Sequence, residues 1–103
     1  MQYCSIYVTA GSEDEARRIG RTLVEEKLAA CVNILPVTSI YRWEENIEEE
    51  GEFVMFVKTK DRLADKVIAR VRELHSYDVP CIVALPIAKG NPDYLKWIEE
   101  TTQ

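Results

Sequence analysis

Four side chains in this sequence have the chemistry of metal ligands or proton carriers: one histidine and three cysteines. His75 is the only histidine, and it lies six residues before Cys81 in the segment LHSYDVPC. A tight turn between them would let an imidazole and a thiol reach the same soft cation. His75 equally fits a helix-closing residue, because the negative end of the helix dipole favours histidine there. Both interpretations stay open on the residues alone.

The other two cysteines, Cys4 and Cys31, have different settings. Cys31 is flanked by alanine and valine and is expected to be a small buried core residue. Three cysteines without a C-x-x-C pair are typical of reduced thiols in an intracellular protein, which predicts a cytoplasmic location. Antiparallel pairing of the strands that begin at Cys4 and Cys81 would put Cys81 near Val8, so we expect no disulfide between these two cysteines.

A second candidate group combines aromatic and cationic side chains: Tyr41, Trp43 and Lys58 on two predicted strands, and Tyr77 in the turn after His75. Such residues could line a cleft between subunits or form oligomer contacts. The sequence has no Gly-rich phosphate loop, no G-x-S-x-G motif and no nucleophile with a partnered base. We therefore predict neither an enzyme nor an organic cofactor.

The composition is that of one folded domain spanning residues 1–103. Hydrophobic residues make up 47% of the chain and charged residues 30%. The 13 basic and 18 acidic residues give a net charge of −5, which disfavours binding to nucleic acid. Arg17, Arg18 and Arg21 are spaced as a solvated helix face. No segment approaches about 18 consecutive apolar residues, so we expect no membrane partner.

The apolar periodicity predicts a strand, a helix and then a hairpin in the first sixty residues. Residues 3–9 alternate as a strand does, and Ser12 with Glu15 forms a capping box that starts a helix at about Glu13. Its inward stripe is Ala16, Ile19, Leu23, Val24 and Leu28. Residues 31–43 and 53–59 form a long hairpin, joined by the acidic stretch EENIEEEGE, which we interpret as a solvated turn bent at Gly51. Pro36 requires either a bulge or a free donor side in its strand.

Asp61 is predicted to cap a second helix, which ends with Leu74 and His75. Its inward stripe is Ala64, Val67, Ile68 and Val71. Residues 81–88 form an apolar strand, and Asn91 with Pro92 opens a last short helix. The order predicts an α+β fold, a ferredoxin-like βαββαβ sandwich with an extra C-terminal helix.

The strand order of this fold places two strands inside the sheet and two at its edges. The first and third strands are expected to be central and parallel, and the second and fourth to be edges. An uncovered apolar edge strand would promote aggregation. Since the fourth strand is almost wholly apolar, we predict that another copy of the chain covers it.

Four segments, EEKLAACVNILPVTSIYRWE, VKTK, LHSYDVP and ALPIAKGNPDYLKWI, resemble in order and spacing the signature segments of the CutA divalent cation tolerance proteins. The resemblance covers nearly the whole chain and is closest from Glu25 to Ile98. It implies a PII-like homotrimer of ferredoxin-like subunits in the cytoplasm. It also implies a role in the tolerance of copper and other divalent cations.

The resemblance further implies which residues bind the cation. Some members of the family are described as binding copper through a first-strand cysteine and a histidine at the LHSY turn. His75 matches that histidine, whereas Val8 stands at the cysteine position and Leu74 precedes His75. Cys81 stands where most relatives have an acidic residue, and strand pairing brings it toward Val8. We therefore expect copper or another divalent cation at His75 and Cys81.

The alternative function is that of a PII-like signal or scaffold protein. Its clefts between subunits would bind a small molecule or a protein partner. The residues that would line such a cleft are Tyr41, Trp43, Lys58 and Tyr77.

Overall fold

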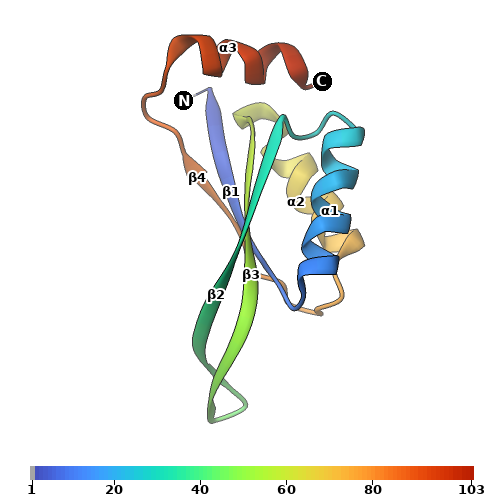
Figure 1. Ribbon diagram of the computed structural model, residues 1–103, viewed down its shortest axis with the longest axis vertical. Coiled ribbons are helices and arrows are strands. Elements are labelled where there is room, and N and C mark those ends of the chain that lie inside the picture. The colour runs from blue at the N-terminus through green and yellow to red at the C-terminus, as the bar shows by residue number, and fades with distance from the viewer. Residues whose placement is uncertain (1) are drawn as a thin grey trace.

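The computed structural model describes residues 2–103 as one four-stranded sheet with two helices on one face and a third at its upper end (Figure 1). The elements are β1 (Tyr3–Ala10), α1 (Glu13–Glu25), β2 (Cys31–Trp43), β3 (Asn46–Lys60), α2 (Ala64–Leu74), β4 (Ile82–Pro86) and α3 (Pro92–Thr101). A single 3₁₀ turn, Asp61–Leu63, precedes α2. The predicted α+β, ferredoxin-like fold with an added C-terminal helix is confirmed.

The strands lie in the order β2-β3-β1-β4, so the prediction of β1 and β3 as central strands and of β2 and β4 as edges is confirmed. The expectation that β1 and β3 run parallel was wrong, because all three strand pairs are antiparallel. The connections explain the direction. Helix α1 returns the chain, so β2 runs the same way as β1, and the hairpin then reverses the chain into β3.

The core lies between the sheet and the layer formed by α1 and α2. Its fully buried side chains include Ile6 and Val8 of β1, Met55 and Val57 of β3, Ile19 and Leu23 of α1, and Val67 and Val71 of α2. Ser12 caps α1 as predicted, because its Oγ accepts a hydrogen bond of 3.1 Å from the backbone N–H of Glu15. Val24 was placed in the inward stripe but is 40% exposed. It follows Leu23 by about 100° around the helix and so leaves the buried side.

The opposite face of the sheet carries no helix over most of its area. Tyr7 and Phe56 meet edge to face on it, with ring centroids 5.7 Å apart. Cys31 also lies on this face, half-buried, so its assignment to the core was wrong. The register explains the difference, since Val32 pairs with the core residue Val57 and its neighbour Cys31 must point to the other side.

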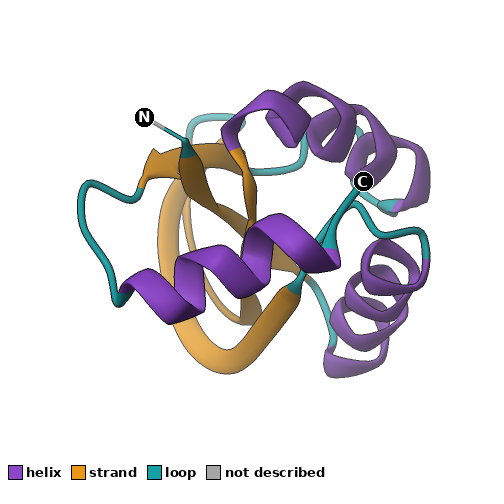
Figure 2. Ribbon diagram, turned by 90° about the horizontal axis from the view of Figure 1, so that it is seen from above, coloured by secondary structure: helices purple, strands orange, loops and turns teal. Residues whose placement is uncertain are grey.

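Helix α3 covers only the upper end of the sheet, apart from the layer of α1 and α2 (Figure 2). Its start matches the sequence prediction, with the side chain of Asn91 accepting a hydrogen bond from the N–H of Asp93 and Pro92 in the first turn. Ile98 anchors the helix and is fully buried. None of the helices between residues 2 and 103 has the length and apolar content needed to cross a lipid bilayer.

β2 and β3 extend beyond the rest of the sheet as a two-stranded ribbon, which gives the subunit its longest dimension of 44 Å (Figure 1). β1 pairs with β3 only from Phe53 to Lys60, so residues 46–52 pair with β2 alone. We call this segment, residues 37–52, the ribbon. The register continues unbroken through Pro36, which excludes a bulge and leaves the missing donor on the free side of an edge strand.

The turn of the ribbon is only two residues long. Glu44 and Glu45 have φ angles of 48° and 70°, the left-handed conformations of the tightest hairpin turns. The interpretation of the whole acidic stretch as a solvated turn bent at Gly51 was therefore wrong. Most of it is strand, because a ribbon with two largely exposed faces can carry charged side chains on both.

The start of α2 also differs from the prediction that Asp61 caps it. Asp61 begins the 3₁₀ turn, its N–H donates to the carbonyl of Gln2 at 2.8 Å, and α2 begins three residues later without a side-chain cap.

Strand β4 is shorter than the predicted apolar run 81–88. Its side chains Val83 and Leu85 are nearly half exposed, so the outer edge of the sheet is apolar and uncovered in one subunit.

Candidate functional site

His75 is the residue that closes α2, and its backbone N–H donates to the carbonyl of Val71 at 2.9 Å. Its side chain is fully buried. Nε2 lies 2.7 Å from the carbonyl oxygen of Thr9, and Nδ1 accepts a hydrogen bond of 3.1 Å from the N–H of Tyr77. This pair of bonds requires a neutral imidazole that carries its proton on Nε2. Both ring nitrogens are therefore engaged by the backbone.

Glu15 supports the same turn from the first helix. Its carboxylate accepts a hydrogen bond of 2.7 Å from the N–H of Ser76 and lies 3.7 Å from Nδ1 of His75. Burial alone would raise the pKa of Glu15. The hydrogen bonds from Ser76 and from the backbone of Gly11 outweigh burial, and the pKa lies below its ordinary value. The carboxylate thus ties the turn after α2 to the start of α1.

Cys81 lies where the chain enters β4, next to the end of β1. The N–H of Thr9 donates to the carbonyl of Cys81 at 3.4 Å, and Val8 pairs with Ile82. The prediction that Cys81 would approach Val8 is thus confirmed. Cys81 is exposed, and Cys4, Cys31 and Cys81 are all free. Burial of its thiol and the charge of Glu52 raise the pKa of Cys81, although a hydrogen bond with Thr9 opposes them.

Glu52 is the acidic residue whose charge acts on this thiol, and it was not among the residues predicted from the sequence. It is 8% exposed, and one carboxylate oxygen accepts a hydrogen bond of 3.0 Å from the hydroxyl of Tyr77. Burial and this carboxylate raise the pKa of Tyr77 to about 12. The sequence signal for this burial is that Glu52 directly precedes the apolar run that begins at Phe53. The interpretation of the acidic stretch as a solvated turn included Glu52 and so hid this signal.

The structure therefore brings the side chain of His75 and the backbone of Cys81 to one residue, Thr9. The side chains of Cys81 and Glu52 are the possible metal ligands in this region that are not hydrogen-bonded to the backbone. Between residues 2 and 103, no three His, Cys, Asp or Glu side chains are arranged as a ready metal site. One chain fits a cation only in part, because His75 would have to release the carbonyl of Thr9 before it could bind.

A surface hollow of about 700 Å³ lies beside this turn and is bordered by Ser76, Tyr77 and Asp78. His75 borders it only through its backbone, since its side chain is fully buried. A cation in the hollow would therefore meet Tyr77 and Asp78 before it met the imidazole.

The four residues expected to line a cleft do not meet within one subunit. Tyr41 pairs with Glu48 in the ribbon, and Lys58 pairs with Cys31 ten residues further along β3. At about 3.3 Å per residue this separates them by roughly 30 Å. Trp43 lies at the ribbon end beside the turn, and Tyr77 follows α2. Residues so far apart can share a cleft only if different subunits supply them.

Tyr41 is held within the ribbon by its own neighbours. Its hydroxyl donates to the carboxylate of Glu50 on the paired strand. This bond and the nearby carboxylates raise the pKa of Tyr41 to about 12. Lys58 donates to the side-chain oxygen of Asn33.

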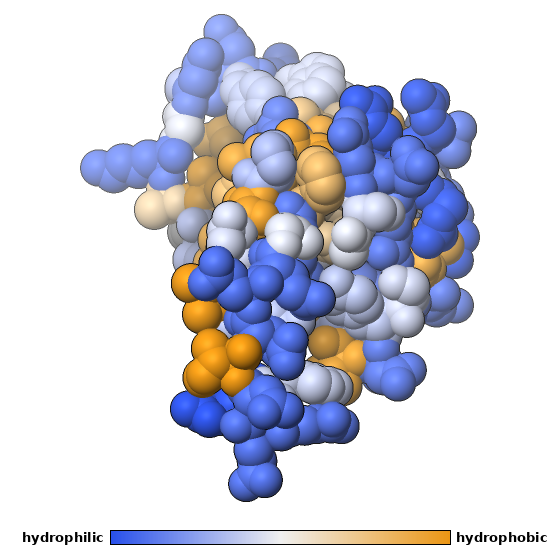
Figure 3. All heavy atoms as spheres, turned by 60° about the horizontal axis from the view of Figure 1, so that its bottom comes forward, coloured by the Kyte–Doolittle hydropathy of each residue, from blue (hydrophilic) through white to orange (hydrophobic). Residues whose placement is uncertain are grey.

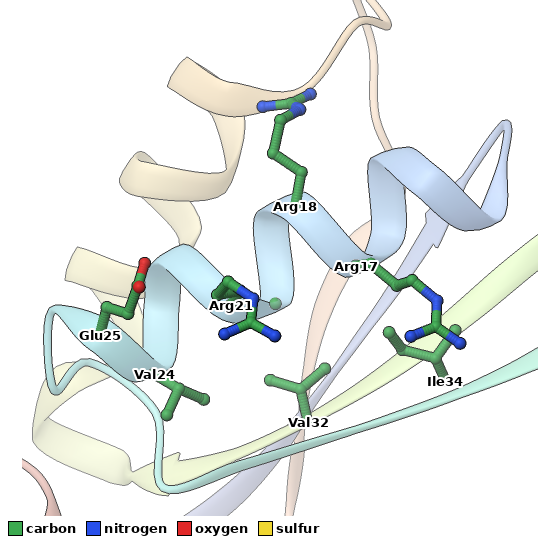
Figure 4. Close-up of a pocket in the computed structure, with 8 residues that line it drawn as sticks. Arg17, Arg18, Arg21, Val24, Glu25, Val32 and Ile34 are labelled. Carbon is green, nitrogen blue, oxygen red and sulfur yellow. The ribbon is translucent and has the colours of Figure 1, made fainter.

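A groove of about 470 Å³ lies between α1 and β2, away from His75 and Cys81 (Figure 4). Arg17 and Arg21 point over Val32 and Ile34, whereas Arg18 turns toward α2 (Figure 4). Arg17 forms an ion pair of 2.7 Å with Glu13. Arg18 donates to the carbonyl of Leu74 at 3.0 Å. Two of the three arginines are thus engaged within the subunit.

Comparison with known proteins gives one consistent family. The family model of the CutA1 divalent ion tolerance protein matches residues 4–101. The divalent-cation tolerance protein CutA of Thermus thermophilus is 52% identical over 98 residues, covering 94% of this chain and 95% of that protein. Protein CutA of Homo sapiens is 43% identical over 98 residues, covering 94% of this chain and 55% of that protein.

Solved structures agree with the sequence matches. The periplasmic divalent cation tolerance protein CutA from Archaeoglobus fulgidus has a TM-score of 0.96 at 48% identity, covering 98% of this chain and 99% of that chain. CutA1 from Oryza sativa has a TM-score of 0.96 at 38% identity, covering 100% of this chain and 95% of that chain.

Proposed function

The chain belongs to the CutA1 divalent ion tolerance protein family, and on that premise we propose that it is a homotrimer that binds copper or another divalent cation. The observation that carries the proposal is that Cys81 is an exposed residue close enough to Glu52 for the charge of that carboxylate to act on its thiol. Burial is the main reason why the pKa of Cys81 is raised, and the charge of Glu52 raises it further because a thiolate and a carboxylate repel each other. A cation between them would turn this repulsion into attraction.

Cys81 is the primary ligand in this proposal, and His75 has one of two roles. As a ligand it would exchange its hydrogen bond to Thr9 for the cation. As a positioning residue it would keep that bond and hold Thr9, and through it Cys81, in place. The two engaged ring nitrogens support the positioning role in a single subunit.

The trimer is supported by apolar surfaces that one subunit leaves open. Ile40 and Ile47 of the ribbon are 66% and 63% exposed, and β4 presents Val83 and Leu85 at an unpaired edge. Figure 3, in which the end of the ribbon comes forward, shows apolar side chains between hydrophilic ones. A two-stranded ribbon is marginally stable alone in water. Contacts with neighbouring subunits would cover both surfaces.

Native mass spectrometry with and without Cu(II), Cu(I) and Zn(II) tests oligomer size and bound cations together. We expect a trimer with Cys81-dependent binding, and Cys81→Ser should weaken copper affinity by about tenfold or more, or about 1.4 kcal/mol. Cys4→Ala is the matched control, because Cys4 is buried away from this end of the sheet. A monomer of 11.9 kDa would contradict the trimer, and unchanged copper affinity in Cys81→Ser would contradict the site.

His75→Ala separates the two roles of the histidine. Loss of two buried hydrogen bonds should lower the free energy of unfolding by about 2 kcal/mol in either case. A ligand role predicts that copper affinity falls by about tenfold even at low temperature, where the variant is folded. A positioning role predicts a smaller loss of affinity that follows the loss of stability.

A second candidate function is a PII-like scaffold that binds a small molecule or a protein between subunits. Trp43 is 54% exposed at the end of a ribbon that projects from the subunit, and this position favours contact with a neighbouring subunit. If a ligand enters that cleft, Trp43→Ala should abolish its binding while cation binding at Cys81 persists. We propose binding rather than catalysis for either function. We also propose a cytoplasmic location, which the three free thiols support.

A further inference from the structure

The side chain of Tyr77 joins two parts of the proposed cation site. Its hydroxyl donates a hydrogen bond of 3.0 Å to a carboxylate oxygen of Glu52 on β3. Its ring lies against the imidazole of His75, with ring centroids 4.7 Å apart, and its backbone N–H donates to Nδ1 of that imidazole at 3.1 Å. One residue thus contacts both the largely buried carboxylate and the buried imidazole.

The hydroxyl of Tyr77 is closely surrounded. Gly11, which follows β1, lies so near that a Cβ built on it would be 3.0 Å from the hydroxyl oxygen and 3.5 Å from a carbon of the ring. The backbone of Gly11 is itself hydrogen-bonded to the carboxylate of Glu15. Contacts with His75 and Gly11 therefore limit where this hydroxyl can lie.

The strand register puts Glu52 and Cys81 on one face of the sheet. Val54 of β3 pairs with Thr9 of β1, and alternation along the strand puts Glu52 on the same face as Val54. On the other side of β1, Cys81 lies opposite Thr9, whose N–H donates to the carbonyl of Cys81 at 3.4 Å. Residues opposite each other in paired strands share a face. The carboxylate and the thiol therefore lie on the same face near the end of β1, which agrees with the effect of the charge of Glu52 on the thiol.

Glu52 depends on Tyr77 for its orientation. Between residues 2 and 103, the hydroxyl of Tyr77 is the one hydrogen-bond donor to the carboxylate of Glu52. A glutamate side chain loses much rotamer freedom when it binds a cation, and a partner that holds it beforehand lowers that entropy cost. Loss of such a partner of a metal ligand costs about tenfold to a hundredfold in metal affinity.

We propose, on the basis of the proposed function, that Tyr77 is a positioning residue that holds the carboxylate of Glu52 for a divalent cation shared with Cys81. His75 acts one step further from the cation, because its imidazole orients Tyr77 and keeps its hydrogen bond to the carbonyl of Thr9. This arrangement accounts for a histidine whose two ring nitrogens are both engaged by the backbone.

The first test needs no cation. In protein isotope-labelled at its glutamate carboxyl carbons, the NMR signal of Glu52 is assigned by its absence in Glu52→Gln. We expect this signal to shift in Tyr77→Phe, which keeps the ring and removes the hydroxyl. Tyr94→Phe, the same change on α3, is the matched control and should leave the signal in place. An unchanged Glu52 signal in Tyr77→Phe would overturn the positioning role.

The second test measures Zn(II) affinity by calorimetry at a temperature where every variant is folded. Tyr77→Phe should lower the affinity by about tenfold, or about 1.4 kcal/mol. Glu52→Gln should also lower it, and Tyr77→Phe should add no further loss in that background, because Tyr77 acts through this carboxylate. Equal losses in both backgrounds would indicate a purely structural role. A higher affinity in Tyr77→Phe would show that the hydroxyl competes with the cation, and either result would overturn the proposal.

Gly11→Ala displaces the hydroxyl of Tyr77 without removing it. No glycine between residues 2 and 103 has a positive φ, so alanine fits the backbone, and its Cβ would push against the hydroxyl. Zn(II) affinity should fall in Gly11→Ala and should be unaffected by this change when Tyr77→Phe is already present. Equal losses with and without the hydroxyl would overturn the role of this contact.

Cys81→Ser separates this inference from the proposed function. If Cys81→Ser and the wild type bind Zn(II) equally, the cation site itself is wrong. If Cys81→Ser lowers the affinity and Tyr77→Phe does not, the cation site stands and the positioning role of Tyr77 is wrong.

Discussion

The carboxylate of Glu15 joins two turns that are far apart in sequence, at the start of α1 and after α2. Its pKa lies below the ordinary value of 4.5 in the folded chain. Ionised Glu15 therefore contributes stability that is present above that value and is lost as the pH falls through the folded pKa. Glu15→Gln should be less stable than the wild type near neutral pH and should lose less stability on acidification.

Urea unfolding of both proteins over a series of pH values measures this difference. Glu13→Gln is the matched control, because Glu13 is more exposed and pairs with Arg17 on the surface of the same helix. Equal acid sensitivity of Glu15→Gln and the wild type would show that another carboxylate carries the effect.

The site could be predicted from the sequence only as far as local patterns reach. The position of His75 at the end of a helix follows from the apolar stripe before it, and the strand register follows from alternation. Its partner Thr9 lies 66 residues away, and no local pattern indicates which carbonyl an imidazole will meet. Glu52 was missed for the same reason, since its burial depends on the loop that carries Tyr77.

At the scale of elements, the turn of the ribbon is strained by its own residues. Glu44 and Glu45 both adopt positive φ, where side chains with a Cβ are disfavoured by roughly 1 kcal/mol or more per residue. Replacing the pair with Asn-Gly should raise the free energy of unfolding by about 1 kcal/mol, because these residues accept that conformation. Thermal unfolding measures the gain.

The replacement also removes two negative charges from an acidic ribbon, so charge needs its own control. Glu44→Gln with Glu45→Gln removes the charges and keeps the strain. If this control is stabilised as much as the Asn-Gly variant, repulsion among the carboxylates and not backbone conformation is the cause.

The helices and strands were predicted correctly where the apolar periodicity and the helix-capping residues agree. Ser12 and Asn91 mark the helix starts, and the alternation of Cys4, Ile6 and Val8 marks β1. The prediction for residues 46–52 was wrong because the charged residues of an exposed strand resemble those of a loop. Only the pairing with β2 across the ribbon reveals the strand. The parallel direction of β1 and β3 was wrong although the predicted connections imply the opposite, since a helix returns the chain to β2 and a hairpin then reverses it into β3.

At the scale of the whole molecule, the proposed trimer should depend on the apolar side chains of the ribbon. Ile47→Ser should weaken assembly by about tenfold or more, since burying an isoleucine contributes about 1.5 to 3 kcal/mol. Ile47→Val keeps most of the apolar surface and is the control. Sedimentation at several concentrations measures the change, and equal association of the serine variant and the wild type would place the interface elsewhere.

The two-residue turn also has a consequence for the order of folding. Each backbone pair of the ribbon joins residues near in sequence, whereas β1 and β4 join Ile6 to Ala84. Hairpins close in about 1 to 10 μs, whereas strands that are far apart in sequence can pair only after the entropy cost of closing a long loop is overcome. The ribbon should therefore zip while β4 is still unpaired, and its isoleucines would then be exposed on a half-formed chain. During synthesis this interval lasts until β4 leaves the ribosome. Association between the exposed ribbons of neighbouring nascent chains is therefore the main risk during the folding of this subunit.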